Sequence, residues 1–366
     1  MKYLSAYLSG LLICCGLVLA LAGSYGRAAD NAPNSSGVID EIVRADLNKG
    51  AWVRGPNMPA PRQDAAAVVL ADRVYVIGGF GARSQQMDTT LVWDPQVVAG
   101  GAADQQEQHA GSHLGSWSYA APIPEPVDHA AAAAVGDYIY VVGGRIEDLV
   151  SNKFWRYDVA NDSWTEMPSM PVPRYAATMQ AYGDKLYVIG GAVSHGNDER
   201  SIEVYNIATG RWALLDNELP YGRTEMESAL VDGRIAVLGG RDDQQRNLTS
   251  CDLFDPASIR WSSCSPLRVP RSDFGLSVVA GRLLAVGGDD IRLSQTTQTT
   301  EISEPSVQGW YSGPWLPGPR HGMAQVTVGT VVWVIGGASW PGTAPSTTVL
   351  RYVSPVVRVK LKGRVP

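Results

Sequence analysis

Apolar and polar positions along the chain form a pattern that recurs six times. Each recurrence holds two apolar runs of strand length separated by a short polar turn, as residues 65–70 and 74–77 illustrate. Two such runs around a Gly or Asp turn predict a β-hairpin. A third run ends in an aromatic residue seven positions before a tryptophan, as with Tyr157 and Trp164. Each recurrence therefore predicts four antiparallel strands.

The recurrences share a fixed internal spacing. Their glycine pairs begin at Gly78, Gly143, Gly190, Gly239, Gly287 and Gly336. An arginine stands 16 residues before five of these pairs, Val127 takes that place in the second repeat, and a tryptophan lies ten or eleven residues earlier still. Paired glycines allow positive φ and close approach of a neighbouring backbone, and the tryptophan offers apolar area between sheets. We assign the arginines to the scaffold, as donors to loop carbonyls.

With this diglycine and its Tyr–Trp spacing, the chain resembles the Kelch repeat family. The resemblance implies an all-β, six-bladed β-propeller of four-stranded antiparallel blades over residues 51–355. No tryptophan follows the sixth glycine pair, whereas Trp52 precedes the first blade. We therefore expect an N-terminal strand, Ala51–Arg54, to form the outer strand of the last blade and close the ring. The alternative is that Val356–Lys360 forms that strand.

Four segments lie outside the repeat pattern. Residues 1–29 combine a basic start, an apolar stretch and small residues, which is typical of a signal peptide cleaved after Ala22 or Ala28. An uncleaved anchor is the alternative. We expect residues 30–50 to form a linker with a brief helix at 38–49, and residues 356–366 a C-terminal tail. Residues 97–113 lengthen one loop of the first blade and are either mobile or functional.

Composition and cysteine usage agree with an exported protein. The formal net charge of −6 argues against nucleic-acid binding, which depends on cationic neutralisation of phosphates. Outside the signal segment only Cys251 and Cys264 remain. If Phe254 lies opposite Trp261 in their hairpin, the two cysteines also face each other and a disulfide follows. We expect a periplasmic or secreted protein with no stable membrane insertion after signal cleavage.

Candidate site residues come from the register of the repeat, since the channel mouth is where a propeller has side chains free for function. The position two after each arginine holds Asp64, His129, Ala176, Glu225, Asp273 and Gly322, and the position before it holds Gln63, Asp128, Tyr175, Thr224, Ser272 and His321. Carboxylates there favour a cation, a sugar or a metal ion over an acidic peptide. Arg145 and Arg241 follow the glycine pairs and suit a carboxylate such as that of an acidic sugar. The predicted ligand-binding residues are Asp64, His129, Tyr175, Glu225, Asp273, His321, Arg145 and Arg241. Solvated rim residues and salt-bridged loops are the alternatives.

The expected function is an exported module that binds a protein partner or a small carbohydrate, with no cofactor and no bound metal. An enzymatic alternative follows from resemblance in fold, size and signal segment to the periplasmic Kelch mutarotases, which epimerise the anomeric centre of sialic acids. In that case Glu225 or Asp273, with His129 or His321, would supply the acid and the base.

Overall fold

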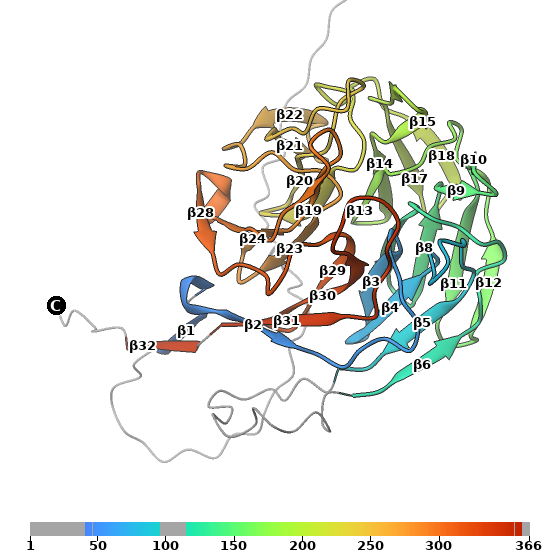
Figure 1. Ribbon diagram of the computed structural model, residues 1–366. Coiled ribbons are helices and arrows are strands. Elements are labelled where there is room, and N and C mark those ends of the chain that lie inside the picture. Colours follow the sequence, from blue (N-terminus) through green and yellow to red (C-terminus); the bar gives the residue numbers. More distant parts are fainter. Residues whose placement is uncertain (1–40, 46, 96–114, 355, 361–366) are drawn as a thin grey trace, which may run out of the picture. The chain divides into compact units, whose positions relative to one another are not determined.

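The computed structural model describes residues 41–45, 47–95, 115–354 and 356–360. Six antiparallel four-stranded sheets follow one another in a ring (Figure 1), which confirms the predicted six-bladed β-propeller. The predicted signal peptide at residues 1–29, the segment that follows it up to residue 40 and the insertion at residues 97–113 lie outside the described residues. In the described part of the chain, no helix has the length and apolar content needed to cross a bilayer.

Each blade runs from an innermost strand at the channel to an outermost strand at the rim. Blade one has β3 (Ala66–Leu70), β4 (Arg73–Ile77), β5 (Thr90–Trp93) and β6 (Trp117–Ala120). Blade two has β7 (Ala131–Val135), β8 (Tyr138–Val142), β11 (Phe154–Asp158) and β12 (Ser163–Glu166). Blade three has β13 (Thr178–Tyr182), β14 (Lys185–Ile189), β17 (Ile202–Asn206) and β18 (Arg211–Leu214). Blade four has β19 (Glu227–Val231), β20 (Arg234–Leu238), β21 (Cys251–Asp255) and β22 (Arg260–Ser263). Blade five has β23 (Gly275–Val279), β24 (Arg282–Val286), β27 (Thr300–Ser303) and β28 (Trp310–Gly313). Blade six has β29 (His321–Val328), β30 (Val331–Ala338), β31 (Val349–Val353) and β2 (Ala51–Arg54). Short ladders join β9 (Arg145–Ile146) to β10 (Leu149–Val150), β15 (Ala192–Ser194) to β16 (Asn197–Asp198) and β25 (Asp289–Asp290) to β26 (Gln295–Thr296), and η3 (Pro305–Val307) is a 3-10 turn.

The last blade takes its outer strand from the beginning of the chain. β2 pairs antiparallel with β31 and places Trp52 opposite Tyr352, with ring centroids 5.1 Å apart. The Trp52 indole N–H also donates to the carbonyl of Pro314 in blade five at 2.9 Å. The predicted closure by Ala51–Arg54 is confirmed. The alternative is wrong, because Val356–Lys360 forms β32 and pairs with β1 (Glu41–Ala45).

The brief helix expected at residues 38–49 is wrong over its described part. Residues 41–45 form the strand β1, and only η1 (Leu47–Lys49) turns, as a single 3-10 turn. The β-branched pair Ile42 and Val43 favours a strand once a partner is present. That partner, β32, comes from the other end of the chain, where no local sequence pattern could reveal it.

The paired glycines bring consecutive blades into direct backbone contact. The second glycine of each pair donates its N–H to the carbonyl at the arginine position of the next blade, as Gly144 does to Arg174 at 2.9 Å and Gly337 to Arg62 at 2.7 Å. The first glycine, Gly143, has φ of +70°, and an added Cβ would overlap the same Arg174 carbonyl. The structural reason inferred for the diglycine is therefore confirmed.

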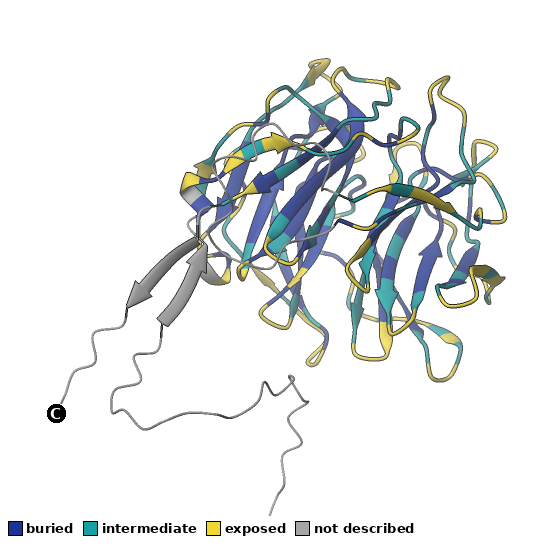
Figure 2. Ribbon diagram, turned by 90° about the horizontal axis from the view of Figure 1, so that it is seen from below, coloured by how far each residue is buried: buried dark blue, intermediate teal, exposed yellow. Residues whose placement is uncertain are grey.

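The core lies between blades rather than within one. In the second strand of blades one to five, the last four residues are all buried, because both faces of each sheet pack against a neighbouring blade (Figure 2). At the junction of blades one and six, Trp93 and Trp333 meet edge to face with ring centroids 4.3 Å apart. The recurring tryptophans also link blades by hydrogen bonds, as Trp164 does by donating to the Ala121 carbonyl of the preceding blade at 2.9 Å.

The recurring arginines belong to the scaffold, as predicted. Arg174 and Arg271 are buried, and each donates to the carbonyl of the first glycine in its own blade, at 3.1 Å and 2.6 Å. The sequence did not indicate that both would also pair with a buried carboxylate. Arg174 meets Glu203 at 2.8 Å and Arg271 meets Glu301 at 2.6 Å.

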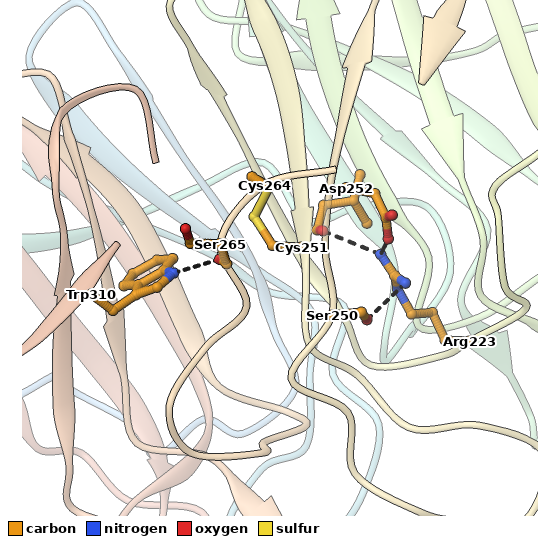
Figure 3. Close-up of a disulfide and its surroundings, with 8 residues drawn as sticks. Arg223, Ser250, Cys251, Asp252, Cys264, Ser265 and Trp310 are labelled. Atoms are coloured by element: carbon orange, nitrogen blue, oxygen red, sulfur yellow. Dashed lines mark hydrogen bonds and ion pairs between the residues drawn. A yellow bond between two sulfur atoms is a disulfide. The ribbon is translucent and has the colours of Figure 1, made fainter. Parts of the chain in front are cut away.

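The predicted disulfide joins the two outer strands of blade four. Cys251 and Cys264 are bonded, with Cα atoms 5.1 Å apart, and Phe254 lies opposite Trp261 in the register that predicted the bond. Figure 3 shows the disulfide next to Ser265, whose carbonyl accepts a hydrogen bond from the Trp310 indole of blade five at 2.8 Å. The disulfide therefore joins the outer part of blade four next to its contact with blade five.

Candidate functional site

Six equivalent residues, one from each blade, form a closed backbone ring at the mouth of the channel. Each donates its N–H to the carbonyl of its counterpart in the preceding blade over 2.8–3.1 Å, and the sixth bond returns to the first residue. The members are Asp64, His129, Ala176, Glu225, Asp273 and Gly322. All six have left-handed backbone angles, with φ between 50° and 59°. This is the position that the repeat register predicted for the channel mouth.

The backbone of this ring suits glycine, yet five of its six members carry side chains. An L-residue other than glycine in the left-handed region costs roughly 1–2 kcal/mol, with less for aspartate. Blade six has Gly322 at this position, so the scaffold accepts glycine there. Residues with a strained backbone conformation are often found at functional sites. Three carboxylates and a histidine at strained positions therefore mark this ring as the candidate site.

His129 lies between two carboxylates. Its Nδ1 is 2.5 Å from Asp128 Oδ1, and its Nε2 is 3.5 Å from Asp64 Oδ2. Burial lowers the pKa of His129, but the charges of Asp64 and Asp128 outweigh it and raise that pKa to about 9. Burial also raises the pKa of Asp64 to about 8 against the opposing effect of His129. The charges of His129 and Asp64 therefore influence each other's pKa inside the mouth.

Arg145 completes the His129 side of the site. Its Nε donates to Asp128 Oδ1 at 2.9 Å, and its guanidinium lies 5.3 Å from the ring centre of Tyr175 and 5.9 Å from that of Phe80. The arginine is thus held by one carboxylate and two aromatic rings. This is the salt-bridged arrangement that sequence reasoning left open as an alternative to binding a ligand carboxylate.

Arg241 occupies the equivalent position in blade four and is also paired internally. Its Nη2 forms an ion pair with Glu225, and its Nη1 is 4.0 Å from Asp289 Oδ1. The Ser272 hydroxyl donates to the same Asp289 oxygen at 2.9 Å. Arg241 therefore connects blade four to blade five across the mouth.

His321 links the last two blades. Its Nδ1 is 2.8 Å from Asp273 Oδ2 and 3.9 Å from Asp289 Oδ2, while its Nε2 is 2.7 Å from the Trp340 carbonyl. A carbonyl oxygen can only accept, so Nε2 carries a proton. Burial lowers the pKa of His321, but its hydrogen bond to Asp273 and the nearby charges raise it to about 9.

The eight predicted ligand-binding residues therefore lie in contacting groups at one mouth of the channel. Asp64, His129, Arg145 and Tyr175 form one group, and Glu225, Arg241, Asp273 and His321 form the other. Asp128 and Asp289 bind members of these groups but were not among the predicted site residues. Asp128 stood among the register positions predicted for the channel mouth, and Asp289 follows its glycine pair as Arg145 and Arg241 follow theirs. The importance of both comes from the side chains that they hold.

Sequence reasoning missed Glu227, a carboxyl group inside the channel. Glu227 borders a cavity of about 200 Å³ that small and polar side chains from all six innermost strands line, including Gln180, Ser228 and Gln325. Burial raises the pKa of Glu227 to about 8, and the Asp273 charge adds to the shift. It stands two residues after Glu225, and the two-residue period of a strand could have placed it on the channel side.

Glu227 is expected to make stability fall as the pH rises. When folding raises the pKa of a carboxyl group, the unfolded chain loses that proton at a lower pH than the folded chain does. The free energy of unfolding then falls as the pH rises from the unfolded pKa to the folded pKa. Stability should therefore decrease from about pH 4.5 up to pH 8, by about 1–2 kcal/mol after allowance for water in the channel. Glu227→Gln should remove this slope in thermal melts across that range. The exposed Glu218 provides the control variant Glu218→Gln, and equal slopes for wild type and Glu227→Gln would refute the assignment.

Fold and site together define a class: a six-bladed β-propeller with a converging polar cluster at one mouth of its channel. Three family models match the sequence, namely the FKB95, Kelch-repeats domain over residues 101–249, the KLHDC2/KLHL20/DRC7 Kelch-repeats domain over residues 176–353 and the Kelch motif over residues 61–97. The chain belongs to the Kelch-repeat β-propeller family. A protein- or ligand-binding module is the function class that this membership supports.

Individual relatives are similar at moderate identity. Kelch-like protein terF of Aspergillus terreus is 26% identical over 331 residues, which is 84% of this chain and 69% of the relative. N-(sulfonatooxy)prop-2-enimidothioate sulfolyase of Thlaspi arvense is 27% identical over 282 residues, 66% of this chain and 75% of the relative. Other curated relatives match over 15–27% of their own length. The solved structure of YjhT, with a TM-score of 0.66 and 16% identity, covers 82% of this chain and 99% of its own, and shows the shared fold.

Proposed function

We propose that the chain is an exported binding module whose channel mouth holds a small polyhydroxylated ligand, a carbohydrate. The observation that carries the proposal is the convergence of buried donors and acceptors from several blades on one mouth. Asp64, Glu225 and Arg241 lie there with side chains 5–12% exposed. Sugar hydroxyls both donate and accept, so a mixed set of charged groups suits them better than it suits a ligand of one charge.

Trp340 adds an aromatic surface beside this polar cluster. Its carbonyl accepts from His321, and the loop around it is held to Gln63, whose side-chain amide donates to the Gly342 carbonyl at 3.0 Å. The Trp340 residue is 73% exposed. An exposed indole on a loop held at the mouth supports the proposal, because its ring is apolar, its N–H is polar and a sugar makes both kinds of contact.

Thermal-shift screening against neutral and acidic sugars tests the proposal. A ligand present at 100 times its Kd should stabilise the protein by about 2.7 kcal/mol. Trp340→Ala and Glu225→Gln should lose most of that shift. The matched control is Trp315→Ala, since Trp315 is also exposed, at 59%, but lies outside the mouth network. A full shift in both mouth variants, or no shift with any sugar, contradicts the proposal and favours a protein partner, to be sought by pull-down with and without residues 97–113.

The proposed location is the periplasm or the cell exterior. The signal-like pattern of residues 1–29 supports it, and so does the disulfide, which persists in oxidising compartments. The N-terminal sequence of the purified mature protein tests this directly. A mature chain that starts at Gly23 or Ala29 agrees with cleavage, and one that retains Met1 contradicts it.

A sugar mutarotase or epimerase is the second candidate, and the Asp64–His129 pair is the observation that favours it. Mutarotation needs an acid and a base at the ring oxygen and the anomeric hydroxyl, and a carboxyl group and an imidazole 3.5 Å apart are the two kinds of group that supply them. The name of the Thlaspi arvense relative denotes a lyase, which supports catalysis on a related chain. NMR of a freshly dissolved anomer distinguishes the two: an enzyme accelerates equilibration, and a binding module does not.

A further inference from the structure

Three side chains at the junction of blades four to six have the spacing of metal ligands. One ligand atom each from Asp273, Asp289 and His321 lies within 4.8 Å of the other two. His321 Nδ1 is 2.8 Å from Asp273 Oδ2 and 3.9 Å from Asp289 Oδ2. An ion with bonds of about 2.0–2.2 Å to nitrogen and oxygen holds its ligand atoms roughly 3–4 Å apart. The two distances from His321 therefore suit one shared ion.

The hydrogen bonds behind these side chains orient them as outer contacts orient metal ligands. His321 Nε2 donates to the Trp340 carbonyl at 2.7 Å, which directs Nδ1 toward both carboxylates. Histidines that bind metals commonly donate their other ring N–H to a carbonyl in this way. Asp289 Oδ1 accepts from Ser272 at 2.9 Å and faces Arg241 at 4.0 Å, so Oδ2 is the oxygen turned to His321. Arg241 thus lies on the far side of Asp289 and is itself paired with Glu225.

A second, independent observation comes from Asp64. Its side chain is only 5% exposed, and its Oδ1 has no hydrogen-bond partner among the described residues. A Cβ placed on Gly322 would overlap this oxygen and lie 3.3 Å from Asp273 Oδ2, so the carboxyl groups of Asp64 and Asp273 border the same position. A buried carboxyl oxygen without a partner is costly, and a cation bound between Asp64 and Asp273 would compensate it.

We propose that Asp273, Asp289 and His321 bind a divalent transition-metal ion of the Zn²⁺ or Mn²⁺ type at the channel mouth, with Asp64 facing the ion's open side. The imidazole nitrogen selects these ions over Ca²⁺ and Mg²⁺, which prefer all-oxygen sets. Three protein ligands leave at least one position for water or for a hydroxyl of a bound molecule. This inference goes beyond the proposed carbohydrate site and does not depend on it.

Calorimetric titration of ZnCl₂ and MnCl₂ into EDTA-treated, dialysed protein tests the proposal. Wild type should bind one equivalent of Zn²⁺ or Mn²⁺, while CaCl₂ and MgCl₂ should bind at least tenfold more weakly. His321→Gln and Asp289→Asn should each weaken binding by about 100-fold or more, because removal of a group that merely orients a ligand already costs 10–100-fold. Asp243→Asn, an exposed loop aspartate of blade four, is the matched control and should bind like wild type.

Cobalt provides a spectroscopic readout that reports the ligands of the bound ion. Co²⁺ bound by one nitrogen and carboxylates should give a visible absorption band in wild type and in Asp243→Asn, and the band should be lost in His321→Gln. Thermal melts without metal establish that each variant folds, and Asp273→Asn replaces any variant that does not. Absence of Zn²⁺ and Mn²⁺ binding by wild type overturns the proposal. So does binding that persists unchanged in both ligand variants, since the ion then lies elsewhere.

Discussion

Replacement of Arg271 by alanine is expected to lower the free energy of unfolding by about 3–5 kcal/mol, because it leaves a buried carboxylate without its partner. The Arg271 guanidinium has no exposed surface and donates to Glu301 at 2.6 Å, to the Gly287 carbonyl at 2.6 Å and to Thr299 Oγ1 at 3.0 Å. Its loss therefore removes several hydrogen bonds within blade five at once. Urea or guanidinium unfolding, followed by tryptophan fluorescence, measures the change.

Glu301→Gln supplies the control for this prediction. Glu301 also accepts from the backbone N–H groups of Arg268 and Val269, at 2.7 Å and 3.0 Å, so an amide of the same shape keeps part of its contacts. If the unpaired charge causes the loss, Arg271→Ala should cost clearly less in the Glu301→Gln background. A change below 1 kcal/mol in the single variant, or identical costs in both backgrounds, would show that the pair does not stabilise the blade.

Asp64→Gly is expected to act in the opposite direction and stabilise the fold by about 2–3 kcal/mol at neutral pH, from backbone relief and removal of a buried carboxyl group. Gly322 occupies the same ring position in blade six, so the backbone accommodates glycine there. Burial raises the pKa of Asp64 to about 8. The destabilisation of the fold by this carboxyl group is therefore small near pH 4 and grows until pH 8. The gain from the variant should grow in the same direction in thermal or chemical unfolding.

Ala176→Gly separates the two contributions. Ala176 has the same left-handed backbone in the same ring but no charge, so its replacement should change stability by about 1 kcal/mol or less, independent of pH. If Asp64→Gly gains no more than Ala176→Gly, the buried carboxyl group carries no cost. A stabilised Asp64→Gly variant that also loses the sugar-induced shift would show that stability has been exchanged for function at this position.

The sequence was sufficient for the fold because the repeat carries its own register. The glycine pairs and tryptophans located every blade, and the unmatched Trp52 indicated the closing strand. The local pattern failed at residues 41–45, whose strand partner β32 lies at the other end of the chain. Secondary structure that depends on a distant partner cannot be derived from a short window of sequence.

For the site, the sequence predicted which residues lie at the mouth of the channel. It did not predict which of them pair with each other. Counting from the arginines located Asp64, Glu225 and Asp273 at the mouth. It left open whether Arg145 and Arg241 pair with Asp128 and Glu225 of their own blades or bind a ligand. It could not indicate that His321 and Asp289 meet, since that contact joins loops of different blades. The left-handed ring was also hidden, because two of its members, Ala176 and Glu225, are of residue types that seldom adopt that conformation.

The hydrogen bond from Trp52 to Pro314 joins residues 262 positions apart, and it has a consequence for biosynthesis. The first blade strand that the ribosome makes is among the last to find its neighbour, because β31 is translated after all the other blade strands. Until then, blade six lacks its rim strand and the nascent polypeptide holds an incomplete ring with unpaired backbone groups. Final assembly must therefore follow synthesis of β31, and shortened chains that end before residue 349 cannot seal the ring.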